Sequence, residues 1–238
     1  MHKMNLDNLR QIRDSVEPIE LPIAEEEICR RYERLYTGCV NDVLRELCLT
    51  NVALPAGIVP LRDEMVCAGF AFTIRSAADP TLAGELELRV KMLDELRPHH
   101  VCVWNANGDD KASHWGEVMT AASRQRGCKG AIIDGGIRDT KGILAQHFPI
   151  WCRYRTSNGS LSRAKITSYQ TPIKVGDVII KPGDLVFADI DGALVVPRKL
   201  CVAVLERAEG IQRNELEIKE WVDAGLSTQE IHDRGGYF

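Results

Sequence analysis

The sequence lacks the features that would mark a secreted, membrane-bound or zinc-stabilised protein. None of its eight cysteines stands in a CxxC, CxC or CC pair, the short spacings that zinc sites use. The first residues hold no apolar core of a signal peptide, and no apolar run approaches the ~18 residues of a membrane span. We therefore expect a cytoplasmic protein with free thiols that contacts no membrane.

Basic residues are not gathered in one region either. Lys and Arg number 30 against 34 Asp and Glu, which gives a formal net charge of −4, and both signs are spread along the chain. A nucleic-acid partner would require a clustered basic face, so we expect none. A chain of 238 residues that is 45% hydrophobic can form a core of its own, without disulfides or structural metal.

Hydrophobic periodicity in the first two thirds of the chain predicts an α/β protein. Helical spacing recurs in four segments, which are residues 23–49 (interrupted at Thr37-Gly38), 85–97, 115–126 and 139–147. Short β-prone runs alternate with these helices, at residues 65–76, 101–104 and 131–134. This alternation is typical of a mainly parallel sheet.

The last third has a different character. Short β-prone runs separated by Gly-Asp and Asp-Gly turns follow one another over residues 150–197 and predict a meander. A long helix is expected after Pro197, closed by Gly225. The expected organisation is a single domain over residues 1–238, with an N-terminal arm over 1–20 and a C-terminal helical extension over 198–238.

The densest set of candidate functional residues follows the β-prone run at 131–134. Two glycines and then Arg138 and Asp139 come next, so we expect the strand to end in the glycines and a helix to follow. Ligands of open α/β sheets bind at this end of the strands. Arg138 could bind a carboxylate or enolate oxygen and Asp139 a hard cation. The alternative is that Asp139 only caps the helix and Arg138 is solvated.

A second candidate group lies one strand–helix unit upstream. Glu117 opens the helix predicted at 115–126, and Asp109 and His114 precede it. If the two strands are neighbours, Glu117 converges with Arg138 and Asp139 on an oxygen-rich site suited to Mg²⁺ or Mn²⁺. Alone, Glu117 would more simply compensate a helix dipole. His114 is either a substrate contact or a surface histidine of a loop.

The stretch GEVMTAASRQRGCKGAIIDGGIRD, residues 116–139, resembles the core motif of the RraA-like family. Residues 67–76 and 182–197 resemble an earlier strand and a later motif, so the likeness runs in order over about residues 37–225. The family includes class II pyruvate aldolases acting on 4-hydroxy-4-methyl-2-oxoglutarate and 4-carboxy-4-hydroxy-2-oxoadipate, and a branch named for a regulator of ribonuclease activity. The resemblance implies an α/β fold, a swivelling β/β/α domain with a central sheet and helical N- and C-terminal extensions, assembled as a homotrimer or homohexamer.

The resemblance also implies roles for single residues. Asp139 would bind the metal, Arg138 would contact the oxo group of pyruvate and its enolate, and Glu117 would hold metal-bound water. Family aldolases commonly have Asp where this chain has Glu117, and the extra methylene could alter the metal's outer shell or the substrate range. The pyruvyl carboxylate would be received by the backbone amides of Gly116, Glu117, Val118 and Met119.

In the aldolases of this family, a glutamate from the neighbouring subunit completes the site. Glu215 is a candidate on physical grounds, because it falls on the apolar stripe of the C-terminal helix, where a carboxylate is costly unless it is paired or bound. Glu217 faces elsewhere and is the weaker candidate. A Glu215–Lys219 pair within the helix is the alternative. The stripe consists of Val204, Ala208, Ile211, Ile218 and Val222.

The expected function is a lyase of the class II aldolase type with Mg²⁺ or Mn²⁺ as cofactor. It would cleave a carbon–carbon bond of a small anionic 2-oxo acid and release pyruvate, through an enolate stabilised by the metal and Arg138. Oxaloacetate decarboxylation is a natural side activity, and water is the expected proton carrier. A Schiff base on Lys129 or Lys141 is disfavoured, since no lysine lies in an evident apolar pocket. The alternatives are a protein-binding regulator of a ribonuclease and a dehydratase or isomerase of sugar-acid derivatives.

Overall fold

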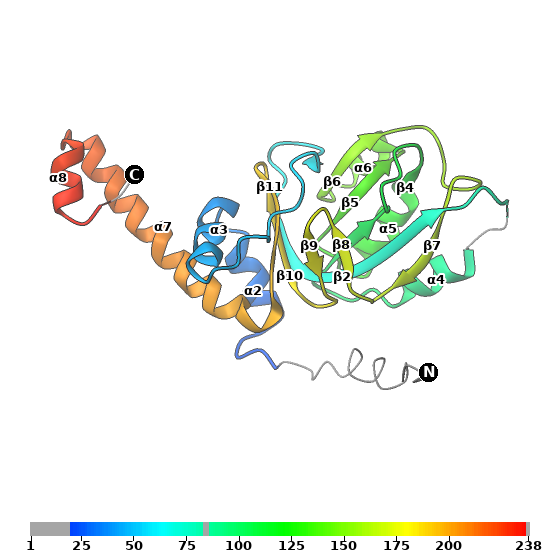
Figure 1. The fold of residues 1–238 in the computed structure, drawn as a ribbon, viewed down its shortest axis with the longest axis horizontal. Coiled ribbons are helices and arrows are strands. Elements are labelled where there is room, and N and C mark those ends of the chain that lie inside the picture. Colours follow the sequence, from blue (N-terminus) through cyan, green and yellow to red (C-terminus); the bar gives the residue numbers. More distant parts are fainter. Residues whose placement is uncertain (1–19, 83–85, 237–238) are drawn as a thin grey trace, which may run out of the picture.

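The computed structural model describes residues 20–82 and 86–236 of the chain. An α/β body carries a group of helices at one end, and from that group a long helix projects with a short one at its far end (Figure 1). These two are α7 (Cys201–Asp223) and α8 (Thr228–Asp233). The predicted arm over residues 1–20 lies outside the described residues except for Glu20. In the described part, no helix has both the length and the apolar composition needed to cross a membrane.

The described residues form a nine-stranded sheet in the order β1-β6-β5-β3-β2-β10-β11, with β4 beside β5 and β7 beside β2. Its strands are β1 (Val59–Pro60), β2 (Cys67–Ala78), β3 (His100–Asn105), β4 (Ser113–Trp115), β5 (Gly130–Ile137), β6 (Ile150–Arg155), β7 (Ala164–Tyr169), β10 (Leu185–Asp189) and β11 (Gly192–Val196). A separate hairpin consists of β8 (Ile173–Val175) and β9 (Val178–Ile180).

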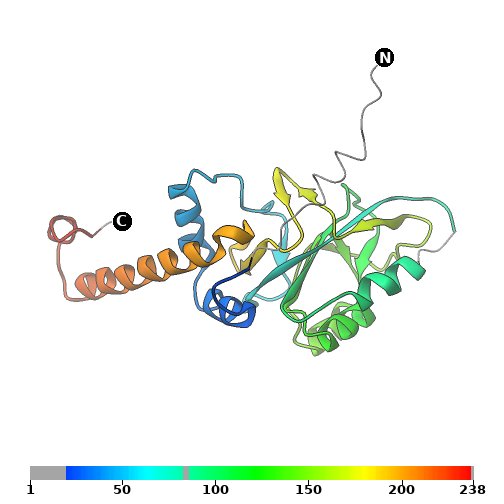
Figure 2. The same cartoon turned by 90° about the horizontal axis from the view of Figure 1, so that it is seen from below.

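The helices are divided between the body and its end. Figure 2 shows the helices of the body on one face of the sheet, opposite the β8–β9 hairpin. These are α4 (Leu86–Asp94), α5 (Glu117–Gln125) and α6 (Thr140–Ala145). The end consists of α2 (Glu25–Tyr32), α3 (Thr37–Glu46), the 3₁₀ turn η1 (Arg198–Leu200) and α7, together with α8.

The expected mainly parallel sheet is correct for the centre and wrong for the periphery. Strands β2, β3, β5 and β6 pair in parallel. Outside them β1, β7, β10 and β11 pair antiparallel. The predicted meander is also wrong as a single unit, because β8–β9 forms its own hairpin while β10–β11 joins the sheet beside β2. Turn spacing predicts hairpins, but it does not predict which strand of the sheet they join.

The prediction that a strand ends in Gly135 and Gly136 is wrong. Strand β5 continues through both glycines to Ile137, since Gly136 still pairs with β4 and β6. A Cβ on Gly136 would lie 2.6 Å from the Ala112 carbonyl oxygen, and one on Gly135 would lie 2.7 Å from the Ala106 Cβ. The two glycines therefore do not end the strand. They allow the segments that contain Ala106 and Ala112 to pack closely against it.

One cluster of buried side chains stabilises the α/β body, and a second stabilises the helical end. Strands β10 and β11 contribute to both clusters, because their side chains alternate between the two faces of the sheet. On β10, Leu185 and Phe187 pack with the helical end, whereas Val186 and Ala188 pack with the body. Strand β11 alternates in the same way, with Val195 toward the body and Val196 toward the helices. This period of two is what a strand between two cores requires.

The cysteines support the interpretation drawn from their spacing. All eight are free, and seven are buried while Cys48 is exposed. Burial raises the pKa of Cys29 to about 12 and that of Cys152 to about 11. Buried thiols of this kind behave as small apolar side chains, not as reactive groups.

Candidate functional site

The candidate site begins where β5 ends and α6 starts. Arg138 follows β5 directly, and its backbone amide donates to the Trp115 carbonyl oxygen at 3.0 Å. Asp139 stands at the N-cap position of α6 with a φ of 58°, in the left-handed region, and its side chain makes no cap hydrogen bond. Only a few per cent of residues other than glycine adopt this conformation, and it is a mildly strained one. Asp139 therefore stands at the N-cap position of α6, as the capping alternative predicts, but its side chain does not cap the helix.

The Asp139 carboxylate turns toward α5. Its Oδ2 accepts a hydrogen bond of 3.4 Å from the backbone amide of Glu117. Gly116, just before that helix, leaves the room, because a Cβ there would lie 2.7 Å from the same oxygen. The carboxylate is 44% exposed, so it is held by the start of a helix and still open to a ligand.

The Glu117 carboxylate lies in turn against α6. A Cβ on Gly142 would lie 2.6 Å from Glu117 Oε1, so the absence of a side chain at Gly142 makes this placement possible. The backbone of Glu117 thus lies beside Asp139 while its carboxylate lies against α6, and the joint action of Glu117, Arg138 and Asp139 stays a prediction. The proximity of the two segments arises because β3 and β5 are parallel neighbours, as the hypothesis required.

Arg138 is half-exposed and only loosely paired. Its Nε lies 3.6 Å from Asp139 Oδ2, too long for a strong charge-assisted hydrogen bond. A Cβ on Gly159 would lie 2.9 Å from Arg138 Nη1, so the loop before β7 passes close to the guanidinium group. The N–H donors of Arg138 are therefore available to an anion.

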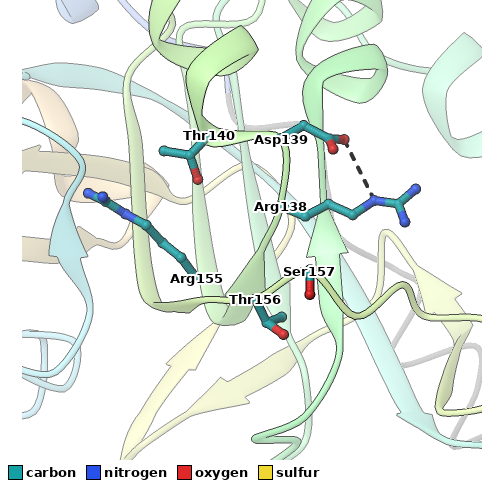
Figure 3. Close-up of a pocket in the computed structure, with 6 residues that line it drawn as sticks. All are labelled: Arg138, Asp139, Thr140, Arg155, Thr156 and Ser157. Carbon is teal, nitrogen blue, oxygen red and sulfur yellow. Dashed lines mark ion pairs between the residues drawn. The ribbon is translucent and has the colours of Figure 1, made fainter.

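A pocket of about 480 Å³ opens beside these residues, a volume typical of small-molecule sites. Figure 3 shows the residues that line it, with Arg138 and Arg155 directed to opposite sides. The lining consists of Arg138, Asp139, Thr140, Arg155, Thr156 and Ser157.

The sequence interpretation missed Thr140, Arg155, Thr156 and Ser157. The last three follow one another where β6 ends, directly beside the end of β5. The rule that selected Arg138, polar residues after a parallel strand, would have selected them too. The sequence places residues 150–155 in the predicted meander, where this rule for parallel strands does not apply.

His114 is neither at the surface nor on the pocket wall. It is 2% exposed, so its interpretation as a surface histidine is wrong. The Trp104 indole N–H donates to Ser76 Oγ at 3.0 Å, and Ser76 Oγ lies 3.1 Å from His114 Nδ1. His114 Nε2 lies 2.9 Å from Asp109 Oδ2.

The protons of this chain of groups can be assigned by elimination. The pKa of Asp109 is lowered, and an ionised carboxylate can only accept, so His114 Nε2 carries a proton and donates it to Asp109. In the neutral ring Nδ1 is then the acceptor, so Ser76 Oγ, which accepts from Trp104, donates its own proton to Nδ1. Burial lowers the pKa of His114, against the opposing effect of Asp109, so the neutral ring is favoured. The predicted substrate contact of His114 would require one of these hydrogen bonds to break.

Glu215 lies in the helical end and is not brought to Arg138 within this chain. The Tyr36 hydroxyl donates to Glu215 Oε2, which accounts for a carboxylate on a packing stripe. Glu217 is exposed. Helix α7 leads away from the body (Figure 2), so a contact of Glu215 with a site in another subunit stays a prediction.

The amides expected to receive a carboxylate stand at the start of α5. Gly116 is the N-cap residue, with an extended backbone and no side chain to cap the helix. The first N–H groups of a helix lack partners within it. Val118 points outward, whereas Met119 is buried, and its Sδ lies 3.0 Å from Arg89 Nη1.

The donor set fits a hydrated hard cation and not a closed metal cage. In residues 20–82 and 86–236, no group of three or more His, Cys, Asp or Glu side chains is placed to hold a metal ion. Asp139 and Glu117 offer two exposed carboxylates, each in a space that a glycine leaves open. Mg²⁺ commonly binds through one or two carboxylates, several waters and substrate oxygens.

The fold and the site together define an α/β protein with a pocket beyond the ends of its parallel strands, lined by two arginines and one carboxylate. Residues 37–195 match the model of the RraA-like family, described as Aldolase/RraA. The chain belongs to this family.

Individual relatives carry different names. A protein of Halalkalibacterium halodurans named "Putative 4-hydroxy-4-methyl-2-oxoglutarate aldolase" is 32% identical over 81% of this chain and 87% of its own length. A solved structure described among novel cellulases from gut-associated microbes is 52% identical, with a TM-score of 0.85 over 90% of this chain and 96% of the other. RraAS2 of Streptomyces coelicolor, described as an unusual member of the RNase ES inhibitor RraA family, is 28% identical, with a TM-score of 0.75 over 85% and 99%. These matches confirm the expected fold.

Proposed function

We propose that this protein is a divalent-metal-dependent lyase that cleaves a carbon–carbon bond of an anionic 2-oxo acid and releases pyruvate. One observation carries the proposal, namely that Arg138 and Asp139 line one pocket and that the Asp139 carboxylate accepts a hydrogen bond from the backbone amide of Glu117, the first residue of α5. The aldolase name of the Halalkalibacterium halodurans relative supports it. A protein that only bound another protein would not need this combination of a guanidinium group and two open carboxylates.

The side chains have separate tasks in such a cleavage. Arg138 donates hydrogen bonds to the oxo oxygen, on which negative charge grows as the bond breaks. The amides of Val118 and Met119 at the start of α5 bind the carboxylate of the 2-oxo acid, as helix N-termini bind anions, since the Glu117 amide already donates to Asp139 Oδ2. Asp139 and Glu117 would hold Mg²⁺ or Mn²⁺, which supplies Lewis-acid polarisation of the substrate when it is bound.

The proton balance assigns the remaining step to water. The hydroxyl group beyond the broken bond loses a proton as it becomes a carbonyl, and the enolate carbon gains one to give pyruvate. The described residues that line the pocket include no histidine and no lysine, so water is the expected carrier. Oxaloacetate would lose carbon dioxide through the same enolate. Trimer or hexamer assembly, with Glu215 reaching a neighbouring site, belongs to the same proposal.

The test is pyruvate release from 4-hydroxy-4-methyl-2-oxoglutarate, 4-carboxy-4-hydroxy-2-oxoadipate and oxaloacetate, with Mg²⁺ or Mn²⁺. We expect activity that EDTA abolishes and that Arg138→Ala lowers on the order of 10²-fold or more. Arg45→Ala, on an exposed arginine of α3, is the matched control and should keep full activity. Pyruvate release that survives thorough EDTA treatment would contradict the metal, and an unchanged Arg138→Ala rate would remove Arg138.

A second candidate function follows from the name of the Streptomyces coelicolor relative, which concerns inhibition of a ribonuclease. It predicts that the chain binds a ribonuclease, that Arg138→Ala leaves this binding intact, and that no pyruvate is released. Reducing sugar released from cellulose, again without pyruvate, would instead favour the activity named for the gut-microbe relative.

A further inference from the structure

Arg89 is a partly buried arginine of α4 that the proposed reaction does not use. Its guanidinium group lies 5.7 Å from the centre of the Trp104 ring, within the range of a cation–π contact, and Trp104 is itself buried on β3. Removal from water, together with the positive charge of Arg138, lowers the pKa of Arg89 to about 10, so the group stays charged at neutral pH. A charged group is thus held against the sheet, close enough to Arg138 for the two charges to interact.

The two terminal nitrogens of Arg89 reach two different segments. Nη1 lies 3.0 Å from Met119 Sδ, in the first turn of α5, and Nη2 lies 3.5 Å from Ser160 Oγ, in the loop between β6 and β7. A thioether sulfur is a weak acceptor, and the contact with Ser160 is long, so each contact depends on a well-placed donor. The planar guanidinium group can make both at once, because its donors have fixed relative directions.

The first segment carries the amides proposed to bind the substrate carboxylate. The first hydrogen bond within α5 runs from the Thr120 amide to the Gly116 carbonyl oxygen at 3.1 Å, so the amides of Val118 and Met119 precede it. The buried side chain of Met119 is the one that Arg89 contacts. A contact that fixes this side chain also limits the directions of the two amides.

The second segment passes the guanidinium group of Arg138. A Cβ on Gly159, the residue before Ser160, would lie 2.9 Å from Arg138 Nη1. Ser157, two residues further back, lines the pocket. The contact between Arg89 and Ser160 therefore holds the loop at the point where it limits the directions available to Arg138.

Another arginine joins α4 and α5 at their other ends. Arg126 follows α5 and binds Asp94, the last residue of α4, through the carboxylate and through the carbonyl oxygen, the latter at 3.0 Å. Both side chains are exposed, and neither is among the described residues that line the pocket. The packing of α4 on α5 thus includes a contact that lies apart from the site, and this contact supplies a matched control for Arg89.

We infer that Arg89 is a positioning residue for the proposed cleavage, which holds the carboxylate-binding start of α5 and the loop beside Arg138 in one fixed arrangement. This inference rests on the proposed function, in which the amides bind the substrate carboxylate and Arg138 contacts the oxo group. Arg89 acts through Met119 and Ser160. The role requires a forked group, so a lysine, with one terminal nitrogen, cannot hold both segments.

The kinetics of Arg89→Met test both contacts at once. This variant keeps an unbranched side chain and removes the guanidinium group. With Mg²⁺ and 4-hydroxy-4-methyl-2-oxoglutarate, below the unfolding range, we expect kcat/KM for pyruvate release to fall about tenfold or more, with kcat lowered and KM raised. Arg89→Lys should recover only part of this loss, and Arg126→Met should keep wild-type values.

Two further variants remove one contact each. Met119→Leu keeps the buried volume without the sulfur acceptor and should mainly raise KM, since the carboxylate is bound alike before and during bond breaking. Ser160→Ala should mainly lower kcat, because Arg138 acts on charge that develops as the bond breaks. Each effect should be smaller than that of Arg89→Met. A purely structural role of Arg89 would not divide between KM and kcat in this way.

Oxalate, which has the size of the pyruvate enolate, gives a measurement that needs no turnover. Titration calorimetry of the full chain with Mg²⁺ should show about tenfold weaker binding to Arg89→Met and unchanged binding to Arg126→Met. If this difference appears although the wild type releases no pyruvate, Arg89 still shapes an anion site and the lyase is contradicted. Oxalate affinity and kinetics of Arg89→Met equal to wild type, full recovery in Arg89→Lys, or the same losses in Arg126→Met would overturn the inference.

Discussion

Arginine and carboxylate side chains are used differently in the helical end and at the pocket of the body. In the helical end, formed by α2, α3, α7 and α8, they are matched to one another, as they also are in the body away from the pocket, for example in Arg153–Asp134. Arg31 binds Glu209 bidentately, and Arg207 binds Glu46 at 3.0 and 2.9 Å. At the pocket, Arg138 and Asp139 are adjacent in sequence yet stand 3.6 Å apart. The same residue types are structural where they satisfy one another and candidates for binding where they do not.

Glycine shows the same contrast. Gly116 and Gly142 each leave the space in which a carboxylate of the site lies. Gly210, inside α7, has only Arg213 Nη2 within 4 Å of the place of a Cβ, at 3.8 Å. The absence of a side chain at Gly116 and Gly142 makes room for the site, whereas its absence at Gly210 makes room for no neighbouring group. The comparison can be tested by changes that should affect only one of the two parts.

The largest effect on stability is expected from Leu205→Ala in the helical end. Leu205 lies on α7 and is fully buried in the cluster of the helical end, so the truncation should cost about 2–5 kcal/mol of unfolding free energy. Denaturant unfolding measures the loss, which Arg138→Ala should not share. Pyruvate release below the unfolding range should remain close to wild type. A loss of activity as large as that of Arg138→Ala would show that the two parts are coupled.

Gly142→Ala should lower activity without lowering stability, which is the reverse of the result expected for Leu205→Ala. Alanine favours a helix over glycine by about 1 kcal/mol, so unfolding should become no easier. The new methyl group must displace the Glu117 carboxylate, and we expect pyruvate release to fall about tenfold. Gly210→Ala is the matched control, with a similar gain in stability and full activity. Full activity of Gly142→Ala would mean that the place of Glu117 is unimportant.

Acid should weaken the body through His114. Its pKa in the folded chain lies below the ordinary value of 6.5, so the unfolded chain takes up the proton first. The stability that His114 supplies is complete above pH 6.5 and is lost as pH falls through the folded pKa. The slope is at most about 1.4 kcal/mol per pH unit for one proton. Denaturant unfolding between pH 7.5 and 5 should show a smaller slope in His114→Gln than in wild type.

The burial of other groups makes that variant necessary. Burial also lowers the pKa of His100, which adds a slope of the same sign. It raises the pKa of Asp134 and Asp184, which contribute in the opposite direction. Only the difference between the pH slopes of wild type and His114→Gln isolates the contribution of the hydrogen-bonded groups from Trp104 to Asp109. Equal slopes in the two proteins would contradict a buried neutral His114.

The smallest effect is expected from Tyr36→Phe in the helical end. The loss of its hydrogen bond to Glu215 should cost about 1 kcal/mol. Urea unfolding gives the size of this cost. If Glu215 acts only within its own chain, pyruvate release will not change in Tyr36→Phe or in Glu215→Gln. A parallel loss of activity in both would instead support its predicted role in a neighbouring subunit's site.

The sequence predicted the site best where the evidence was local and repeated. Two strand–helix units placed Glu117 beside Arg138 and Asp139 once β3 and β5 were assumed to be neighbours, and the structure pairs those strands. Helical spacing predicted α2, α3, α5 and α7 within a few residues. These features depend on periodicity and on the common direction of parallel strands, which a sequence displays directly.

The rest depended on contacts between segments that are distant in sequence. Arg155 lines the pocket because β6 lies beside β5, and nothing in its own neighbourhood indicates that pairing. The burial of His114 depends on Ser76 and Trp104, which come from two other strands. Gly136 belongs to a strand because Tyr154 and Ala112 approach it, and this closeness is invisible in a pair of glycines.

The uneven burial of the thiols makes this chain convenient for single-site labelling. Seven cysteines are enclosed, so a maleimide dye should react at Cys48, which follows α3 in the helical end. A dye there would leave the pocket residues untouched. Counting the photobleaching steps of one labelled particle would then count its subunits, and three steps or six would distinguish the two predicted assemblies.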